Sequence, residues 1–292
     1  MTRPRNKVKV MDLKTVIQFA RVVNAAYAVD PGNLTNAAGK SLSVGGTNYT
    51  VVTTIYCNDL ATDINPLRGD SIVSIGLVLQ AEGTGDVVLA VRGTEGIMEW
   101  VQDARFCLVS CPFAAGAGNT EDGFTAMYNT FRVGSDPQKS APLRSALATL
   151  DFPKSVTAAT SVTICGHSLG GALATLVALD VAANTIFKNP AVYTYASPRT
   201  GDTAFTAFYN HMVPNTTRIA NRMDLVPKLP MPPLYDHVSA PSELNPVQMA
   251  PWPPKVLVKP TLACEHILDT YLYLLSLAAG GEVIPLDAQC AA

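Results

Sequence analysis

The segment that most constrains this chain is 166–170, which reads GHSLG. A short apolar run at 161–165 precedes it, and a longer apolar run follows it. A serine with glycine two residues away on either side, set between a strand and a helix, is typical of a nucleophile elbow. The turn strains the serine backbone, so bulky neighbours would clash. We expect Ser168 to present its hydroxyl at a helix N-terminus; the alternative is a glycine-rich helix start with a surface serine.

The rest of the chain alternates between strand and helix patterns. This alternation predicts an α/β fold with a mostly parallel central sheet and helices on both faces. No linker divides the sequence, so we expect residues 1–292 to form a single domain. The proline-rich stretch 227–260 should be irregular, with one short strand at 255–259. The expected strands are 71–80, 86–91 (paired as a hairpin), 161–165, 191–195 and 216–220, and the expected helices are 123–131, 143–150, 171–183, 203–211 and 267–279.

The N-terminal segment favours a packed amphipathic helix. Val16, Ala20, Val23 and Tyr27 recur at helical spacing. Charged residues interrupt the apolar run that a signal peptide needs. The sequence contains no run of about 20 apolar residues, so we expect no transmembrane helix. We therefore expect a cytoplasmic location by default, with secretion by a signal-independent route left open.

Charge and cysteine content restrict the classes of function. The formal net charge is -2, which gives no basic footprint for nucleic acid. The six cysteines have no zinc-like spacing, and without an export signal free thiols are favoured over disulfides, although Cys107 and Cys111 are close enough in sequence to bridge. We expect neither a metal nor an organic cofactor; the oligomeric state stays open.

A serine nucleophile needs a histidine base and an orienting carboxylate, which follow it in that fold in the order acid, then histidine. Asp224 comes just past the strand 216–220, where the acid should lie. His266 begins the final helix, whereas His237 follows Asp224 after only 13 residues, with no predicted strand between them. We favour His266 as the base and keep His237 as the alternative; the other interpretation of His237 is a supporting hydrogen-bonding role.

An oxyanion hole needs two donors near the serine. The backbone N–H of Leu169 is one candidate, because it follows the nucleophile. Thr94 is the other, because it ends the strand 86–91 and can aim its N–H and hydroxyl at one oxygen. Taken alone, Thr94 could equally be an ordinary turn residue.

At this point the sequence resembles the class 3, fungal-type, lipase family. The resemblance runs in order from about residue 16 to 275. One departure is Glu121, which stands where the family's V-H-x-G-F segment has a supporting histidine. The matching segments are 91–94 (VRGT), 96–103 (GIMEWVQD), 121–124 (EDGF), 166–174 (GHSLGGALA), 195–202 (YASPRTGD), 221–227 (NRMDLVP) and the C-terminal His266.

The resemblance implies an α/β-hydrolase fold, a triad of Ser168, Asp224 and His266, and an oxyanion hole of Thr94 and Leu169. It also implies a carboxyl-ester hydrolase that acts on a lipid or small-molecule ester, most simply a triacylglycerol lipase in transient contact with a lipid–water interface. The alternatives are a feruloyl or short-chain esterase, a phospholipase A1 and, more remotely, a non-catalytic lipid-binding protein.

The segment 96–103 also matches the family's short lid helix. It places large apolar side chains next to the candidate oxyanion residue: Ile97, Met98, Trp100 and Val101. A flap that swings aside at an oil–water interface would expose an apolar groove. The alternative is a helix that packs permanently on the core. We favour the flap.

Overall fold

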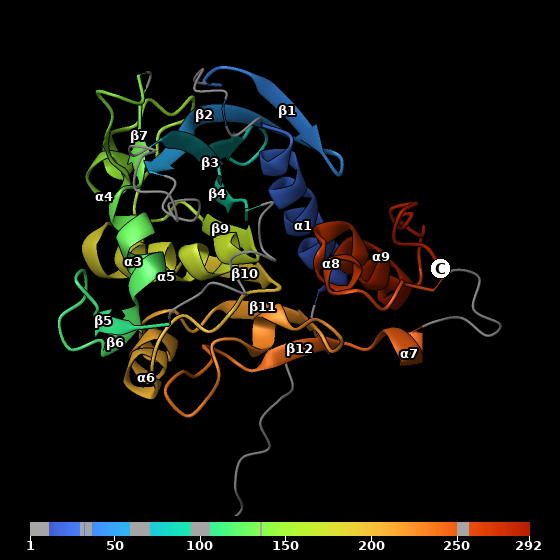
Figure 1. Ribbon diagram of the computed structural model, residues 1–292. Coiled ribbons are helices and arrows are strands. Elements are labelled where there is room, and N and C mark those ends of the chain that lie inside the picture. Colours follow the sequence, from blue (N-terminus) through green and yellow to red (C-terminus); the bar gives the residue numbers. More distant parts are fainter. Residues whose placement is uncertain are drawn as a thin grey trace, which may run out of the picture.

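The structure is a computed structural model that describes residues 12–29, 32, 37–58, 71–94, 106–134, 136–249 and 257–292. Within these ranges, ten strands form one mixed sheet in the order β12-β11-β10-β9-β4-β3-β2-β7-β8, and β1 pairs with β2 beside this path (Figure 1). The strands are β1 (Ser41–Val44), β2 (Thr47–Asn58), β3 (Ile72–Ala81), β4 (Val87–Val91), β7 (Arg132–Val133), β8 (Ala141–Pro142), β9 (Val162–His167), β10 (Ala191–Tyr195), β11 (Thr216–Asn221) and β12 (Pro241–Leu244). A separate pair joins β5 (Leu108–Ser110) to β6 (Asn119–Glu121).

The sheet has a parallel half and an antiparallel half. Strands β4, β9, β10, β11 and β12 are parallel to one another, whereas β3, β2, β7, β8 and β1 pair antiparallel, and β3 joins the two halves through its antiparallel pairing with β4. The carboxyl ends of parallel strands meet at one edge of a sheet, which is where ligand sites form in such folds. The loops after β4, β9 and β11 therefore converge at the candidate site.

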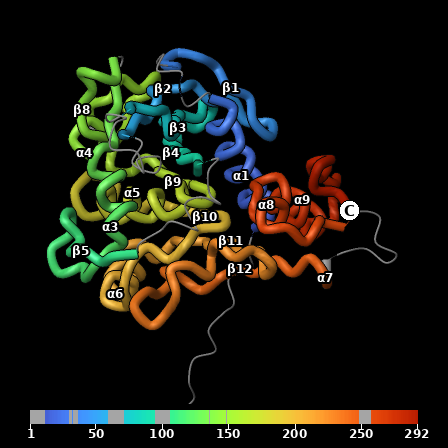
Figure 2. The backbone as a smooth tube through the Cα atoms, viewed as in Figure 1, coloured from blue at the N-terminus to red at the C-terminus, as the bar shows by residue number. Residues whose placement is uncertain are grey.

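Helices cover both faces of the sheet, as predicted. On one face lie α3 (Asp122–Asn129), α4 (Leu143–Ala146), α5 (Leu169–Asn184) and α6 (Thr203–Met212). On the other face α1 (Leu13–Tyr27) packs beside α9 (Leu268–Ala279), with α8 (Leu262–His266) and α7 (Pro246–Met249) near the same end (Figures 1 and 2). The first and last described helices thus lie side by side although they are far apart in sequence. No helix in the described ranges is both long and apolar enough to span a bilayer.

The predicted pattern agrees with most of these elements, and the α/β fold class is confirmed. The hairpin of β3 and β4 forms as expected. The prediction omitted seven of the described strands, namely β1, β2, β5, β6, β7, β8 and β12. The longest of them is β2, and β12 lies in the proline-rich stretch expected to be irregular, where it pairs in parallel with β11. Pro241 begins β12, an edge position that tolerates a missing N–H.

The strand expected at 255–259 is not found in the described part of that range. Residues 250–256 lie outside the described ranges, and Val258 makes a single isolated bridge to Ala291. The C-terminal residues therefore pair with this short segment: the Lys259 N–H donates to the Cys290 carbonyl over 2.9 Å, and the Ala292 N–H donates to the Leu257 carbonyl over 2.7 Å.

This pairing overturns the expectation that all cysteines are free. Cys264 and Cys290 form a disulfide across 26 residues of sequence. The sequence pattern does not predict this disulfide, because Cys290 comes to lie beside α8 only when the C-terminal segment pairs with residues 257–259. Cys107 and Cys111 remain free thiols, as do Cys57 and Cys165.

The disulfide should stabilise the end of the fold that carries His266. Closing a loop of this length restricts the unfolded chain, so Cys290→Ser should lower the free energy of unfolding by about 3 kcal/mol. Urea denaturation would measure the difference. Cys107→Ser, which removes an exposed free thiol, is the matched control and should leave the unfolding midpoint unchanged; an equal midpoint for both variants would contradict the prediction.

Candidate active site

Ser168 occupies the sharp turn between β9 and α5. Its backbone angles are φ 59° and ψ -131°, a conformation that non-glycine residues rarely adopt. The flanking glycines are needed because other backbone comes very close. A Cβ on Gly166 would lie 2.1 Å from the Gly170 carbonyl oxygen, and one on Gly170 would lie 2.4 Å from the carbonyl oxygens of Val91 and Arg92. The turn is the nucleophile elbow that the sequence predicted.

The structure brings Ser168, His266 and Asp224 together. The Oγ atom of Ser168 lies 2.8 Å from Nε2 of His266, and Nδ1 of the same ring lies 2.8 Å from Oδ2 of Asp224. These contacts join residues 98 and 42 positions apart in sequence. All three side chains are buried. The arrangement is that of a nucleophile, a general base and the carboxylate that orients the base.

Asp224 is fully buried, so its carboxylate needs donors on both oxygens. The Val226 N–H donates to Oδ1 over 2.9 Å. The Tyr271 hydroxyl donates to Oδ2 over 2.8 Å and accepts from the Asn221 N–H over 2.9 Å. Sequence reasoning missed Tyr271, because an apolar helix gives no signal that one of its tyrosines reaches a carboxylate.

His237, the alternative base, lies elsewhere. Its Nε2–H donates to the carbonyl of Pro227, the last residue of segment 221–227, which carries Asp224 and is called the acid loop below. Burial lowers the pKa of His237 to about 3, and the nearby Arg218 guanidinium acts in the same direction. The side chain supports the segment after Asp224, so His266 is the histidine that the structure places at the serine.

The candidate oxyanion residues lie on either side of the serine. Leu169 begins α5, and the first N–H groups of a helix have no acceptor within the helix. Thr94 follows β4 and lines a hollow of about 340 Å³ together with His266. The lid prediction at 96–103, with Ile97, Met98, Trp100 and Val101, lies outside the described residues.

Glu121, which departs from the family pattern, has a structural role. Its side chain accepts a hydrogen bond from the Phe124 N–H over 2.7 Å and so caps the N-terminus of α3. Burial raises the pKa of this carboxyl. The replacement leaves the relay of Ser168, His266 and Asp224 intact.

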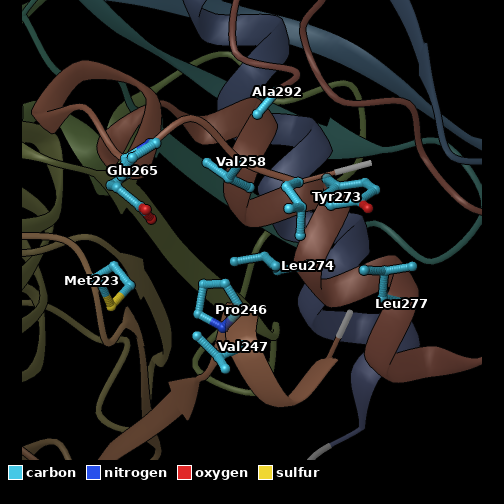
Figure 3. Close-up of a pocket in the computed structure, with 11 residues that line it drawn as sticks. Met223, Pro246, Val247, Val258, Glu265, Tyr273, Leu274, Leu277 and Ala292 are labelled. Carbon is cyan, nitrogen blue, oxygen red and sulfur yellow. The ribbon is translucent and has the colours of Figure 1, made fainter. Parts of the chain in front are cut away.

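A second hollow of about 300 Å³ lies between α7, α9 and the acid loop (Figure 3). Its walls are mostly apolar, and Glu265 is the charged group among the lining residues. The Glu265 carboxylate accepts a hydrogen bond from Asn221 Nδ2 over 2.8 Å. Two neighbouring residues of α8 thus face different sites: Glu265 faces this hollow, while His266 faces Ser168.

The fold agrees with the comparison of this chain with known proteins. A model of the class 3 lipase family matches residues 88–233, which is half of the chain, and the chain belongs to this family. The matched range includes all but the first residue of β4, the elbow and Asp224, whereas His266 lies beyond it.

The individual proteins that this chain resembles include phospholipases and lipases. The chain is 34% identical over 167 residues to phospholipase A1-II 4 of Oryza sativa subsp. japonica, a match that covers 51% of this chain and 41% of that protein. It is 26% identical to secreted mono- and diacylglycerol lipase 1 of Fusarium solani, covering 76% of this chain and 60% of that protein. The match therefore spans about two fifths to three fifths of these curated relatives. The solved mono- and diacylglycerol lipase of Aspergillus oryzae is similar with a TM-score of 0.61 and 25% identity, covering 79% of each chain.

The close backbone contact at the elbow gives a stability prediction. Gly166→Ala places a methyl group against the Gly170 carbonyl, so the variant should lose about 1–3 kcal/mol of unfolding free energy and most of its esterase activity. Gly83→Ala is the control, because a Cβ at Gly83 meets nothing within 4 Å. Chemical denaturation and p-nitrophenyl ester assays would measure both; equal behaviour of the two variants would count against this account of the elbow.

The depressed pKa of His237 gives a pH prediction. Below about pH 6.5 His237 is protonated in the unfolded chain, whereas in the folded protein it stays neutral down to about pH 3. The free energy of unfolding is therefore highest above pH 6.5 and decreases as the pH falls. Between pH 7 and pH 5, His237→Gln should lose about 1–2 kcal/mol less unfolding free energy than the wild type. Denaturant titrations at both pH values test this, and an unchanged pH dependence would contradict it.

Proposed function

We propose that the protein is a serine carboxyl-ester hydrolase that cleaves acyl esters of glycerol, with triacylglycerol as the expected substrate. The observation that carries the proposal is the hydrogen-bonded relay from Ser168 through His266 to Asp224. A serine hydroxyl is a weak nucleophile until a base accepts its proton, and this relay supplies the base and fixes its tautomer. Membership of the class 3 lipase family supports the same chemistry.

In this mechanism Ser168 Oγ attacks the ester carbonyl carbon while His266 Nε2 accepts the hydroxyl proton. Asp224 holds the Nδ1–H and stabilises the positive charge on the imidazole. The tetrahedral intermediate then collapses: the bond to the alcohol oxygen breaks, and that oxygen takes the proton from His266. A water molecule repeats the sequence on the acyl-serine, releasing the fatty acid and restoring Ser168.

The negative charge of the intermediate needs donors in place before reaction. We assign this role to the backbone N–H of Leu169 and to Thr94, which flank Ser168 from α5 and from the end of β4. The positive end of the α5 dipole adds to the stabilisation. Removing one donor from such a site costs about 10²–10³-fold in rate.

The hollow beside His266 favours a neutral substrate over a phospholipid. Its described lining residues include no lysine or arginine, and Asp269 contributes a carboxyl group. Burial raises the pKa of Asp269, and the nearby Asp287 raises it further. Among the described lining residues, an anionic phosphodiester would meet an acid and no cation, whereas glycerol hydroxyls can hydrogen-bond to Asp269 and to Asn24. We therefore favour neutral glycerides over the phospholipid substrates named for the rice relative.

The test compares emulsified triacylglycerol and diacylglycerol with vesicles of phosphatidylglycerol, whose headgroup is anionic. The wild type should favour the neutral lipids, and Asp269→Asn should raise the relative rate on phosphatidylglycerol about 3–10-fold by removing a like charge. Ser168→Ala is the control and should lose about 10⁶-fold in kcat on every ester. Faster hydrolysis of phosphatidylglycerol by the wild type would instead support a phospholipase A1.

The same enzyme preparations distinguish the remaining alternatives. A p-nitrophenyl ester series should show a preference for long acyl chains, whereas a maximum at acetate or at feruloyl esters would support a soluble-ester esterase. A fluorophosphonate probe should label the wild type and leave Ser168→Ala unlabelled. Absence of labelling in the wild type would support a non-catalytic lipid-binding protein.

A further inference from the structure

The last residue of the first helix reaches the centre of the site. The hydroxyl of Tyr27 accepts a hydrogen bond from the Gly93 N–H over 2.8 Å. The same hydroxyl lies 2.8 Å from Nδ1 of His167. Tyr27 therefore joins the segment before Thr94 to the residue before Ser168, although 140 positions separate Tyr27 from His167.

His167 continues this contact to the general base. Its Nε2 lies 2.9 Å from the backbone carbonyl oxygen of His266. A carbonyl can only accept, so Nε2 carries the proton and Nδ1 accepts from the Tyr27 hydroxyl. Three hydrogen bonds thus run in one direction: the Gly93 N–H donates to the Tyr27 hydroxyl, this hydroxyl donates to His167, and His167 donates to the His266 carbonyl.

The directions of these three hydrogen bonds depend on His167 being neutral. Burial lowers the pKa of His167 well below 6.5, and the neighbouring His266 lowers it further. A neutral His167 holds one donor and one acceptor, which is what its two partners require. The rings of His167 and His266 also lie close, with centroids 4.9 Å apart.

The backbone around Gly93 is packed too closely for these parts to move independently. A Cβ on Gly93 would lie 2.6 Å from the Tyr27 hydroxyl and 2.9 Å from both the His167 carbonyl oxygen and Ser168 Cβ. The oxyanion segment, the elbow and the base thus meet at one point. Contacts this close leave little room for one of them to shift while the others stay in place.

We infer that Tyr27 and His167 are positioning residues for the hydrolysis proposed above, on which this inference rests. Together they fix the oxyanion segment at Gly93 and the base at His266 in register with Ser168. In this account the N-terminal helix is part of the catalytic apparatus as well as of the core. A misplacement of about 1 Å at reacting groups can cost about 10²-fold in rate, so the effect should appear in turnover.

The first experiment removes a single hydroxyl. Tyr27→Phe should lower kcat on soluble p-nitrophenyl butyrate about 10–100-fold with KM unchanged within about 2-fold, because the substrate still binds while the reacting groups lose their register. Tyr49→Phe is the matched control. Tyr49 lies on strand β2, and its hydroxyl accepts a hydrogen bond over 3.2 Å from Gln18, which lies on α1 as Tyr27 does. It should keep wild-type kcat at a similar thermal midpoint.

The second experiment varies His167 itself. Glutamine can donate from its amide nitrogen to the His266 carbonyl and accept from Tyr27 with its oxygen, whereas leucine can do neither. His167→Gln should therefore retain at least about a tenth of wild-type kcat, and His167→Leu should fall about 10-fold or more below His167→Gln. Circular dichroism and thermal melts show whether each variant is folded.

Two results would overturn the inference while leaving the proposed function in place. One is a Tyr27→Phe enzyme whose kcat equals that of Tyr49→Phe, and the other is equal turnover of folded His167→Gln and His167→Leu. A wild type that hydrolyses no ester would instead overturn the proposed function and, with it, this inference. Loss of folding in both His167 variants with normal turnover of Tyr27→Phe would assign the pair a purely structural role.

Discussion

The site depends on a close approach of backbone where β9 turns into α5. Glycines at 166 and 170 permit contacts that any side chain would prevent, and Gly93 lets the end of β4 reach the same point. Interiors packed this tightly do not deform gradually, so the strained conformation of Ser168 is held in place by its surroundings. The geometry of the nucleophile therefore depends on the end of β4 as well as on the turn itself.

Burial of polar groups is the second constraint. Asp224, His266, His167 and Tyr271 all lie out of solvent, and an unsatisfied polar group in such a place costs about 1–3 kcal/mol. Each of the four has a hydrogen-bond partner. The same bonds that remove this cost also fix the direction of each donor, so the structural requirement and the catalytic requirement are met by one network.

The substrate side of the site is simpler. The hollow beside His266 is lined by apolar side chains together with Asp269 and Asn24, and the proposed preference for neutral glycerol esters rests on that lining. The apolar hollow behind the acid loop is separate from it, and the residues that line it include none of the triad (Figure 3). In the proposed function, the Asp269 carboxyl governs selectivity and the relay of Ser168, His266 and Asp224 governs the chemistry.

The sequence by itself determined the local chemistry: the elbow at 166–170, the acid after β11, the histidine before the final helix and the alternation of strands and helices. These features are visible because turn glycines, β-branched runs and helical periodicity act over a few residues. Tertiary structure alone decided the long-range partners, namely the disulfide between Cys264 and Cys290, the pairing of β12 with β11, the Tyr271 bond to Asp224 and the contact of Tyr27 with His167. Such contacts join residues that are distant in the chain, and no local pattern encodes which of several equivalent side chains will meet when the helices dock.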